Sequence, residues 1–200
     1  MQVCFVTGNS GKFAEAEKIL KDFGVNISHQ NLQINEIRSD SLEEIASASA
    51  REAYAGLGQP LFVEDSGLFI PSLNGFPGPY SAWVFRKLGN RGILRLASGK
   101  PAEFRACIGY TDGKALHAFT GSVKGRISDE SRGSGGFGYD PIFIPEKFPG
   151  IRHSGEKTFA ESPGMKTALS HRKRALEKLG EFLQESRNKQ DKKLGVSQGV

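Results

Sequence analysis

The sequence predicts an α/β fold with a mixed β-sheet and flanking helices. Two observations carry this prediction: three short apolar runs alternate with two amphipathic stretches over residues 1–70, and a tight-turn signal, Thr111-Asp112-Gly113-Lys114, joins two apolar runs later in the chain. Strands that alternate with helices favour parallel pairing, whereas a two-strand hairpin is antiparallel. This combination is typical of a mixed sheet covered by helices.

Three strands and two helices are expected in the first part of the chain. The strands cover residues 2–7, 25–34 and 60–70, and the helices cover residues 12–23 and 42–57. Apolar side chains three and four residues apart, such as Phe13, Ala16 and Leu20, predict the first helix, and Gly24 ends it. Ser41, with Glu44 three residues further on, predicts a capping box at the start of the second helix.

A hairpin and a closing helix are expected in the rest of the chain. Helical stretches are expected over residues 81–88 and 92–97, strands over 104–110, 115–123 and 141–145, and the last helix over 169–183. Asp112-Gly113 suits the tight turn of the hairpin, because both central positions of such a turn need a positive φ. No repeat or linker divides residues 1–185, so one domain is expected there.

The positive charge is concentrated near the C-terminus. The 200 residues have a formal net charge of +5, and residues 187–200 contain four Lys or Arg and one Asp. Because this segment has little to bury, residues 186–200 are expected to form a disordered basic tail. A nucleic-acid-binding tail is the alternative. The charges are few and no aromatic residue lies among them, so no stable nucleic-acid partner is expected.

A cytoplasmic location is expected. The N-terminus has no basic start, and no apolar run approaches the ~18 residues that a membrane-spanning helix needs. Cys4 and Cys107 lie far apart in apolar stretches. This arrangement favours two buried thiols over a disulfide or a zinc site.

The segment TGNSGK, residues 7–12, occupies the expected turn from the first strand into the first helix. Free N–H groups at a helix start can bind phosphate oxygens, glycines allow a close approach, and Lys12 adds a charge. The spacing is not that of a Walker loop, since Gly8 and Gly11 are separated by two residues and Phe13 follows the lysine. A phosphate-binding loop and an ordinary strand–helix turn both stay open on this motif alone.

Carboxylates follow two of the expected strands. Asn35-Glu36 is expected to end the second strand, and Glu64-Asp65 is expected to end the third. Because parallel strands end at one edge of a sheet, these side chains are expected to gather there and to bind Mg²⁺, which compensates their charge and also binds substrate phosphates. The alternative is that Glu36 is a solvated loop residue and that Glu64 pairs with a lysine. Asp65, followed by Ser66-Gly67, is the stronger functional candidate.

A second glycine-rich segment, GSGGFGYDP at residues 133–141, contains two aromatic side chains. Phe137 and Tyr139 can stack on a base or anchor the loop in the core, and Asp140 can accept a hydrogen bond or hold the loop. Further along, MKTALSHRKRA at residues 165–175 brings the donors Lys166, His171 and Arg172 to the start of the last helix.

Together these motifs resemble the inosine/xanthosine triphosphate pyrophosphatase family, whose members hydrolyse non-standard purine nucleotides. The resemblance covers residues 1–185 and rests on six motifs in the family's order. They are TGNSGK at 7–12, VEDSGL at 63–68, GFPGPYSA at 75–82, GFGYDPIF at 136–143, TFAE at 158–161 and SHR at 170–172. No single motif is diagnostic, but six in order are hard to obtain by chance.

The resemblance implies an elongated, two-lobed mixed-sheet fold, a homodimer and Mg²⁺-dependent hydrolysis. The implied substrates are ITP, dITP and XTP, which are converted to the monophosphate and pyrophosphate. A phosphatase of phosphorylated metabolites and a nucleotide-binding module without turnover are the alternatives.

The resemblance also implies roles for individual residues. Asp65 matches the proposed general base, Glu36 and Asp65 match metal-associated acids, and Ser66 lies beside the substrate. The residues implied to bind the triphosphate are Thr7, Gly8, Asn9, Ser10, Gly11 and Lys12. The residues implied to bind the rest of the nucleotide are Phe137, Gly138, Tyr139, Asp140, Lys166, His171 and Arg172.

One departure from the family pattern concerns the second expected helix. Many relatives have a lysine there, and Ser49 stands at the equivalent position of this chain. Either Arg51 replaces the lysine by reaching over one turn, or the phosphate contact is absent.

Overall fold

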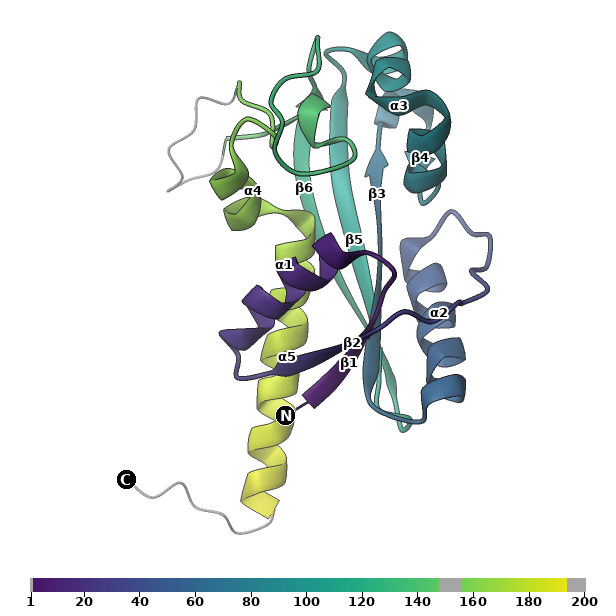
Figure 1. The fold of residues 1–200 in the computed structure, drawn as a ribbon, viewed down its shortest axis with the longest axis vertical. Coiled ribbons are helices and arrows are strands. Elements are labelled where there is room, and N and C mark those ends of the chain that lie inside the picture. The colour runs from purple at the N-terminus through teal and green to yellow at the C-terminus, as the bar shows by residue number, and fades with distance from the viewer. Residues whose placement is uncertain (1, 148–155, 194–200) are drawn as a thin grey trace.

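The computed structural model describes residues 2–147 and 156–193 and shows an elongated molecule with an upper and a lower lobe (Figure 1). A mixed sheet runs the length of the molecule, in the strand order β2-β1-β3-β5-β6-β7, with β4 paired to β3. Its strands are β1 (Gln2–Val6), β2 (Asn26–Gln30), β3 (Leu61–Phe69), β4 (Pro77–Gly78), β5 (Pro101–Thr111), β6 (Leu116–Ile127) and β7 (Phe143–Pro145). The predicted α/β class, the mixed sheet and the elongated form are confirmed.

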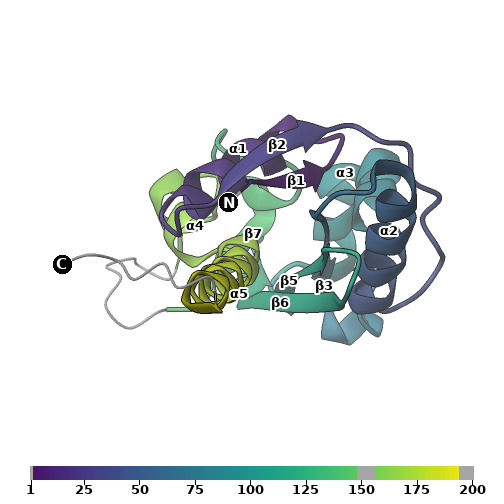
Figure 2. The same ribbon diagram turned by 90° about the horizontal axis from the view of Figure 1, so that it is seen from below.

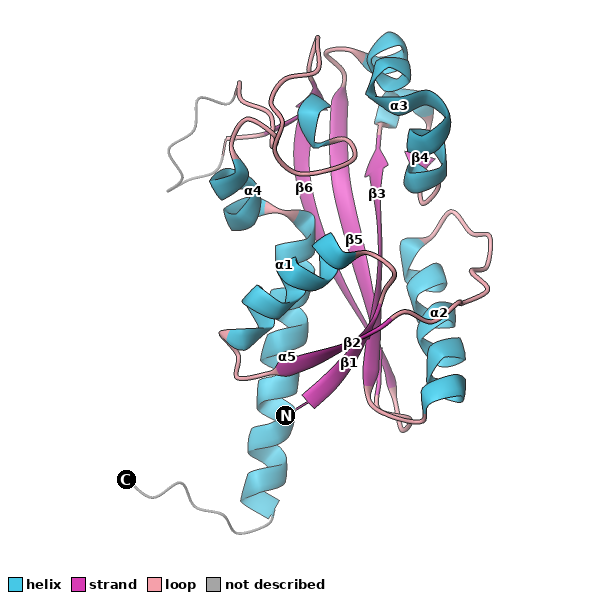
Figure 3. Cartoon of the chain, viewed as in Figure 1, coloured by secondary structure: helices cyan, strands magenta, loops and turns pink. Residues whose placement is uncertain are grey.

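Helices flank this sheet along its length (Figure 3). They are α1 (Ser10–Lys21), α2 (Leu42–Leu57), α3 (Ser81–Ala97), α4 (Pro163–Leu169) and α5 (His171–Lys193), with short 3₁₀ turns at Pro71–Leu73 and Asp140–Ile142. Seen along the long axis, α5 lies to one side of β3 and α2 to the other (Figure 2). The predicted hairpin is confirmed as the antiparallel pair β5 and β6. Its connection spans residues 112–115, and Gly113 but not Asp112 has a positive φ, so the expected turn with two positive φ angles is wrong.

Three apolar clusters hold the lobes together. In the lower lobe, Phe5, Leu20 and Leu179 belong to a cluster that joins β1, α1 and α5, while a second cluster packs α2 on the other face of the sheet. The upper lobe has its own cluster, built around residues such as Ile93 and Phe143. Because β3, β5 and β6 contribute to more than one cluster, the sheet connects the two lobes.

The pairing of β3 differs from the expectation that carboxylates end a strand. β1 pairs with β3 only at Leu61 and Phe62, and β4 pairs with it only at Leu68 and Phe69, whereas β5 pairs along the whole strand. Residues 63–67 of β3 therefore have a strand neighbour on one side only. Glu64 and Asp65 lie in the middle of the strand, so the prediction that they end it is wrong. Antiparallel pairing with β5 carries β3 beyond the point where its parallel partner stops.

Helix starts follow the local signals in part. Asn9 caps α1 by accepting a hydrogen bond from the backbone N of Lys12, so this helix begins two residues earlier than predicted. Ser41 caps α2 as predicted and accepts a hydrogen bond from the backbone N of Glu44 at 3.3 Å. The Glu44 carboxylate accepts a hydrogen bond from the hydroxyl of Ser39, which itself accepts one from the backbone N of Ser41. In a standard capping box the Glu44 carboxylate would accept directly from the backbone N of Ser41. Here the hydroxyl of Ser39 lies between them and bonds to both.

Other boundaries shift for similar reasons. β2 ends at Gln30 instead of residue 34, because its only partner, β1, is five residues long. The two predicted helical stretches after residue 81 form α3, with a break at Gly89, whose φ is +59°. α5 continues to Lys193. The prediction of a disordered tail from residue 186 is therefore wrong for residues 186–193. Good helix formers such as Glu185 and Arg187 extend the helix. Residues 194–200 lie outside the described residues.

Both cysteines are buried and free, as predicted. Cys4 lies on β1 and Cys107 on β5, within the cluster under α2. Among the described residues, no helix combines the length and the apolar character that crossing a membrane requires. The cytoplasmic location stays a prediction.

The close contact between α2 and β5 can be tested at Gly109. A Cβ at this position would overlap the backbone carbonyl of Ala46, so we expect Gly109→Ala to lower the free energy of unfolding by about 1–3 kcal/mol. Gly56→Ala is the matched control, since its Cβ would meet only Leu32, at 3.8 Å, and should change stability by less than about 1 kcal/mol. Urea unfolding measures both variants, and equal effects would contradict the contact.

Candidate functional site

A cavity of about 810 Å³ lies between the two lobes, against the open edge of β3. Its walls come from the β1–α1 turn, the segment after β2, α2, α3, the glycine-rich segment before β7, and the start of α5. Most of the site residues expected from sequence line it. These are Thr7, Gly8, Asn9, Lys12, Glu36, Asp65, Ser66, Phe137, Gly138, Tyr139, Asp140, Lys166, His171 and Arg172. Ser10 and Gly11 do not line the cavity.

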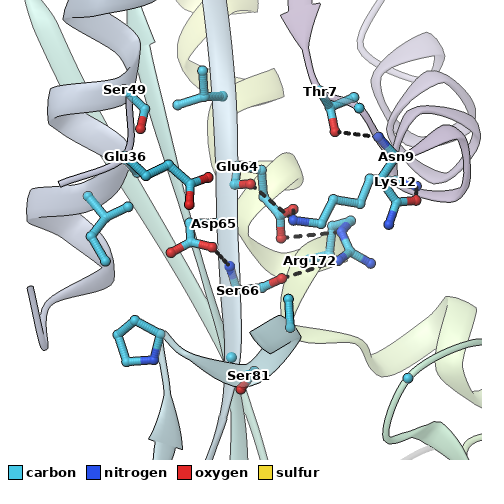
Figure 4. A pocket seen from close by; sticks show the side chains of 18 of the residues that line it. Thr7, Asn9, Lys12, Glu36, Ser49, Glu64, Asp65, Ser66, Ser81 and Arg172 are labelled. Carbon is cyan, nitrogen blue, oxygen red and sulfur yellow. Dashed lines mark hydrogen bonds and ion pairs between the residues drawn. The ribbon is translucent and has the colours of Figure 1, made fainter. Parts of the chain in front are cut away.

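The β1–α1 turn is held by its own side chains (Figure 4). The backbone N of Asn9 donates to Thr7 Oγ1 at 3.1 Å, and Asn9 Oδ1 accepts from the backbone N of Lys12 at 3.0 Å. A Cβ at Gly11 would lie 3.7 Å from the ring of Phe137, so this glycine packs against the opposite wall of the site. The turn thus directs Lys12 toward β3.

Lys12 fills the gap left beside β3. Its Nζ donates to the backbone carbonyl of Glu64 at 3.1 Å, where a further strand would otherwise supply a partner. The same Nζ lies 2.7 Å from the carboxylate of Glu64, whose side chain is 1% exposed. The alternative raised from sequence, that Glu64 pairs with a lysine, is therefore confirmed.

Arg172 approaches the same carboxylate from the other side. Its Nε lies 3.3 Å from Glu64 Oε1, and its side chain is 2% exposed. Burial alone would raise the pKa of Glu64, but the charges of Arg172 and Lys12 outweigh it and lower that pKa to about 2. Glu64 is therefore an ionised, structural carboxylate between two cations.

The ion pairs continue from Arg172 toward the glycine-rich segment. Arg172 Nη1 lies 2.6 Å from Glu15 on α1, and the other oxygen of Glu15 lies 3.3 Å from Lys166 Nζ. Lys166 in turn lies 2.8 Å from Asp140 Oδ2. We call this series of six alternating charges, from Lys12 to Asp140, the charge chain. It links α1, β3, α4, α5 and the segment before β7.

Sequence reasoning missed Glu15 and did not count Glu64 as a site residue. A usable signal existed for both. Glu15 lies three residues after Lys12, which places the two side chains on one face of a helix. Glu64 and Asp65 are neighbours on a strand and must point to opposite faces, so they meet different partners.

Asp65 lies on the opposite face of β3 and points toward Glu36 (Figure 4). No Lys or Arg among the described residues forms an ion pair with either carboxylate; the backbone N of Ser66 donates to Asp65 at 2.9 Å. Burial raises the pKa of Asp65 to about 7; Lys12 opposes this, and the charges of Glu64 and Glu36 add to it. Glu36 lies in the segment after β2, so it does not end that strand as expected, yet it lines the same cavity.

This pair of carboxylates suits a cation that brings further ligands with it. In the part of the chain that the structure describes, no three His, Cys, Asp or Glu side chains lie close enough to hold a metal by themselves. Mg²⁺ typically takes one or two carboxylates together with substrate phosphates and waters. Glu36 and Asp65 match that requirement, whereas a closed zinc-type site does not fit.

The two aromatic residues of the glycine-rich segment have different environments. Phe137 is 41% exposed, and Lys166 Nζ lies 4.0 Å from its ring centroid. Tyr139 is buried and donates from its hydroxyl to the backbone carbonyl of Ser81, so it anchors the segment in the core. Asp140 is also buried and accepts from the backbone N of Phe137 at 2.7 Å. Of the two aromatic residues in this segment, Phe137 is the one with an exposed ring at the cavity.

His171 begins α5 and stacks on Phe104, with ring centroids 4.8 Å apart and an interplanar angle of 12°. Burial and the neighbouring charge of Arg172 hold the pKa of His171 well below its ordinary value, so the ring is neutral. Its buried Nδ1 has no hydrogen-bond partner among the described residues. A buried polar atom without a hydrogen-bond partner raises the free energy of the folded state. A ligand that forms a hydrogen bond with Nδ1 would remove this cost.

Ser66 and Gly67 complete the floor of the cavity. Arg172 Nη2 donates to Ser66 Oγ at 3.4 Å. A Cβ at Gly67 would overlap the carbonyl of Gly78, so a side chain there would push β4 away. Ser81 locks this contact: its hydroxyl accepts from the backbone N of Leu68 at 2.8 Å and donates to the carbonyl of Gly78 at 2.6 Å.

On α2, Ser49 and Arg51 lie in different environments. Ser49 is buried and lines the cavity, whereas Arg51 is exposed and is not among the lining residues. Two residues further along a helix is about half a turn, so Arg51 points away from Ser49.

Comparison with known proteins agrees with this fold. Residues 3–182 match the model of the Ham1 family. A dITP/XTP pyrophosphatase of Methanopyrus kandleri is 50% identical over 187 residues, covering 91% of this chain and 96% of the relative, and one of Thermococcus kodakarensis is 45% identical, covering 93% and 99%. A solved HAM1 protein from Coxiella burnetii is 32% identical with a TM-score of 0.76, covering 92% and 99%. The chain therefore belongs to the Ham1 family.

The role of Glu64 can be tested by removing its charge. Glu64→Gln leaves Lys12 and Arg172 without their shared buried partner, so we expect the free energy of unfolding at pH 7 to fall by about 3 kcal/mol. The difference from wild type should shrink as the pH approaches about 2, where the native carboxylate takes up a proton. Glu17→Gln, on the exposed side of α1, is the control. If both variants unfold at the same urea concentration, Glu64 does not hold the site together.

The raised pKa of Asp65 predicts a pH-dependent stability. The native carboxyl takes up its proton at about pH 7 and the unfolded one near 3.8, so ionised Asp65 destabilises the fold progressively between these values. Without metal or nucleotide, Asp65→Asn should therefore be more stable than wild type at pH 8 and similar at pH 4. Thermal unfolding in EDTA measures both, and a difference that does not change with pH would contradict the prediction.

Proposed function

We propose that this protein hydrolyses deaminated purine nucleoside triphosphates, ITP, dITP and XTP, to the monophosphate and pyrophosphate. The observation that carries the proposal is that one cavity combines two carboxylates, Glu36 and Asp65, which have no ion-pair partner among the described residues, with the cations of the charge chain. The names of the relatives, dITP/XTP pyrophosphatases, support the same substrates.

Hydrolysis would proceed by attack of water on the α-phosphorus, with pyrophosphate as the leaving group. Asp65 is suited to orient this water and accept its proton; without metal, burial raises its pKa to about 7. Lys12 and the start of α1 would receive phosphate oxygens and offset the growing negative charge. Glu36 and Asp65 would hold Mg²⁺, which supplies charge neutralisation on the phosphates and lowers the pKa of bound water.

Base selection would rest on donors at the other end of the cavity. Phe137 offers an aromatic face for stacking, and His171 and Arg172 lie on the same wall. Inosine and xanthine have a 6-oxo acceptor where adenine has an amino donor. A fixed donor at that position therefore binds the oxo base and leaves adenine with an unmatched group, which can discriminate by roughly 10²- to 10⁵-fold. The neutral His171 ring can supply such a donor through Nδ1 as the N–H tautomer.

A homodimer is part of the same proposal. α3 exposes three large apolar side chains, Trp83 at 57%, Leu88 at 46% and Leu96 at 51%. Association with a second copy would remove such side chains from water. Sedimentation equilibrium distinguishes the dimer from a monomer.

Asp65→Asn tests the catalytic assignment. We expect the variant to lose at least about 10²-fold in kcat while it binds ITP about as well as wild type, because the amide keeps the shape of the site but cannot accept a proton. Pyrophosphate release measures turnover with and without EDTA, and calorimetry measures binding. Asp22→Asn, at the exposed end of α1, is the control.

The products also distinguish the alternatives. Orthophosphate as the first product would favour a phosphatase, and tight ITP binding without any product would favour a binding module. Unchanged turnover of Asp65→Asn would remove this residue from the mechanism.

A further inference from the structure

Among the described residues, four Lys and Arg side chains line the cavity, and three of them already have a carboxylate partner. Lys12 pairs with Glu64, Lys166 with Asp140, and Arg172 with Glu64. These pairs are largely buried, so a phosphate that recruits such a cation must either share it or displace its carboxylate.

Arg86 is the fourth cation, and its situation is different. It is exposed to the cavity and forms no ion pair or hydrogen bond with any residue in the described part of the chain. It lies on the face of α3 that also contributes Ser81, Ala82 and Phe85 to the lining. Its guanidinium is therefore the cavity's unpaired positive charge.

Two contacts hold the part of α3 that carries Arg86. Ser81, at the start of α3, is tied to the backbone of Leu68 on β3, three residues beyond Asp65. Phe85, the neighbour of Arg86, packs edge-on against Tyr139 at 5.2 Å between ring centroids. α3 therefore holds Arg86 on the wall between the carboxylate pair and the glycine-rich segment.

We propose that Arg86 binds the polyphosphate of the substrate, as the cation that needs no internal ion pair to be broken. This inference rests on the proposed function, since it assumes a nucleoside triphosphate in this cavity. The polyphosphate is the strongly charged part of such a substrate, and a planar guanidinium matches a phosphate group with two parallel hydrogen bonds. Arg86 would approach it from the α3 wall while Lys12 approaches from the α1 wall.

Arg86→Gln removes the charge and keeps a helix-forming side chain of similar length. We expect kcat/KM for ITP to fall about 10- to 100-fold, the range of a lost charge-assisted hydrogen bond. Arg86→Lys should recover part of this loss. Arg91→Gln is the matched control, because Arg91 is an exposed arginine of the same helix outside the cavity lining.

Competitive inhibitors identify which part of the substrate Arg86 touches. The inhibition constant of inorganic tripolyphosphate should rise about 10-fold or more in Arg86→Gln, and that of inosine should not change. A change for inosine alone would show a base contact and overturn the inference, as would equal kinetics of Arg86→Gln and Arg91→Gln.

Failure of the proposed function would look different. In that case wild type would release no pyrophosphate from any purine triphosphate. Calorimetric titration of inorganic tripolyphosphate into wild type and Arg86→Gln would then still test the role of Arg86. Equal affinities would overturn it, and weaker binding by the variant would support it.

Discussion

The carboxylate of Glu64 is buried with Lys12 on one side and Arg172 on the other, and the arrangement of the whole cavity depends on it. An ionised carboxylate inside a protein is costly unless cations and hydrogen bonds compensate it. The two cations come from α1 and α5, which are far apart in sequence, so folding must bring both helices to the same point of β3. The same contacts place the β1–α1 turn and the start of α5 on facing walls of one cavity.

Successive side chains of β3 point to opposite faces of the sheet, so the neighbouring acids Glu64 and Asp65 lie in different environments and have opposite pKa shifts. Glu64 faces the cations, and its pKa is lowered to about 2; Asp65 faces Glu36, and its pKa is raised to about 7. Environments that push the pKa values of two carboxylates apart are typical of sites that need one fixed charge and one proton acceptor. The gap in the sheet beside residues 63–67 makes this possible, because it opens one edge of the strand to Lys12 and to the cavity.

The charge chain also neutralises, within the protein, the cations of a cavity proposed to bind a polyanion. Its six members alternate in sign and add up to no net charge, and the partners of Arg172 and Lys166 include Glu15, which joins α1 to α4 and α5. Groups held this way are oriented before a ligand arrives, which is the condition for electrostatic preorganisation. The cost is that these cations are shared, whereas Glu36, Asp65 and Arg86 stay available on the other walls.

Local signals in the sequence determined much of this. The Ser41 cap, the Asp112-Gly113 turn, the apolar spacing of α1 and the order of the motifs indicated the elements, the fold class and about half of the residues that line the cavity. Tertiary structure decided the rest, because it depends on pairing between distant segments. It decided where β3 loses its parallel partner, which face of β3 meets Lys12 and Arg172, and that Tyr139 is a core anchor while Phe137 faces the cavity. It also left Arg86 without a partner in the described part of the chain. A sequence shows which charges exist, but only the folded chain shows which of them neutralise one another.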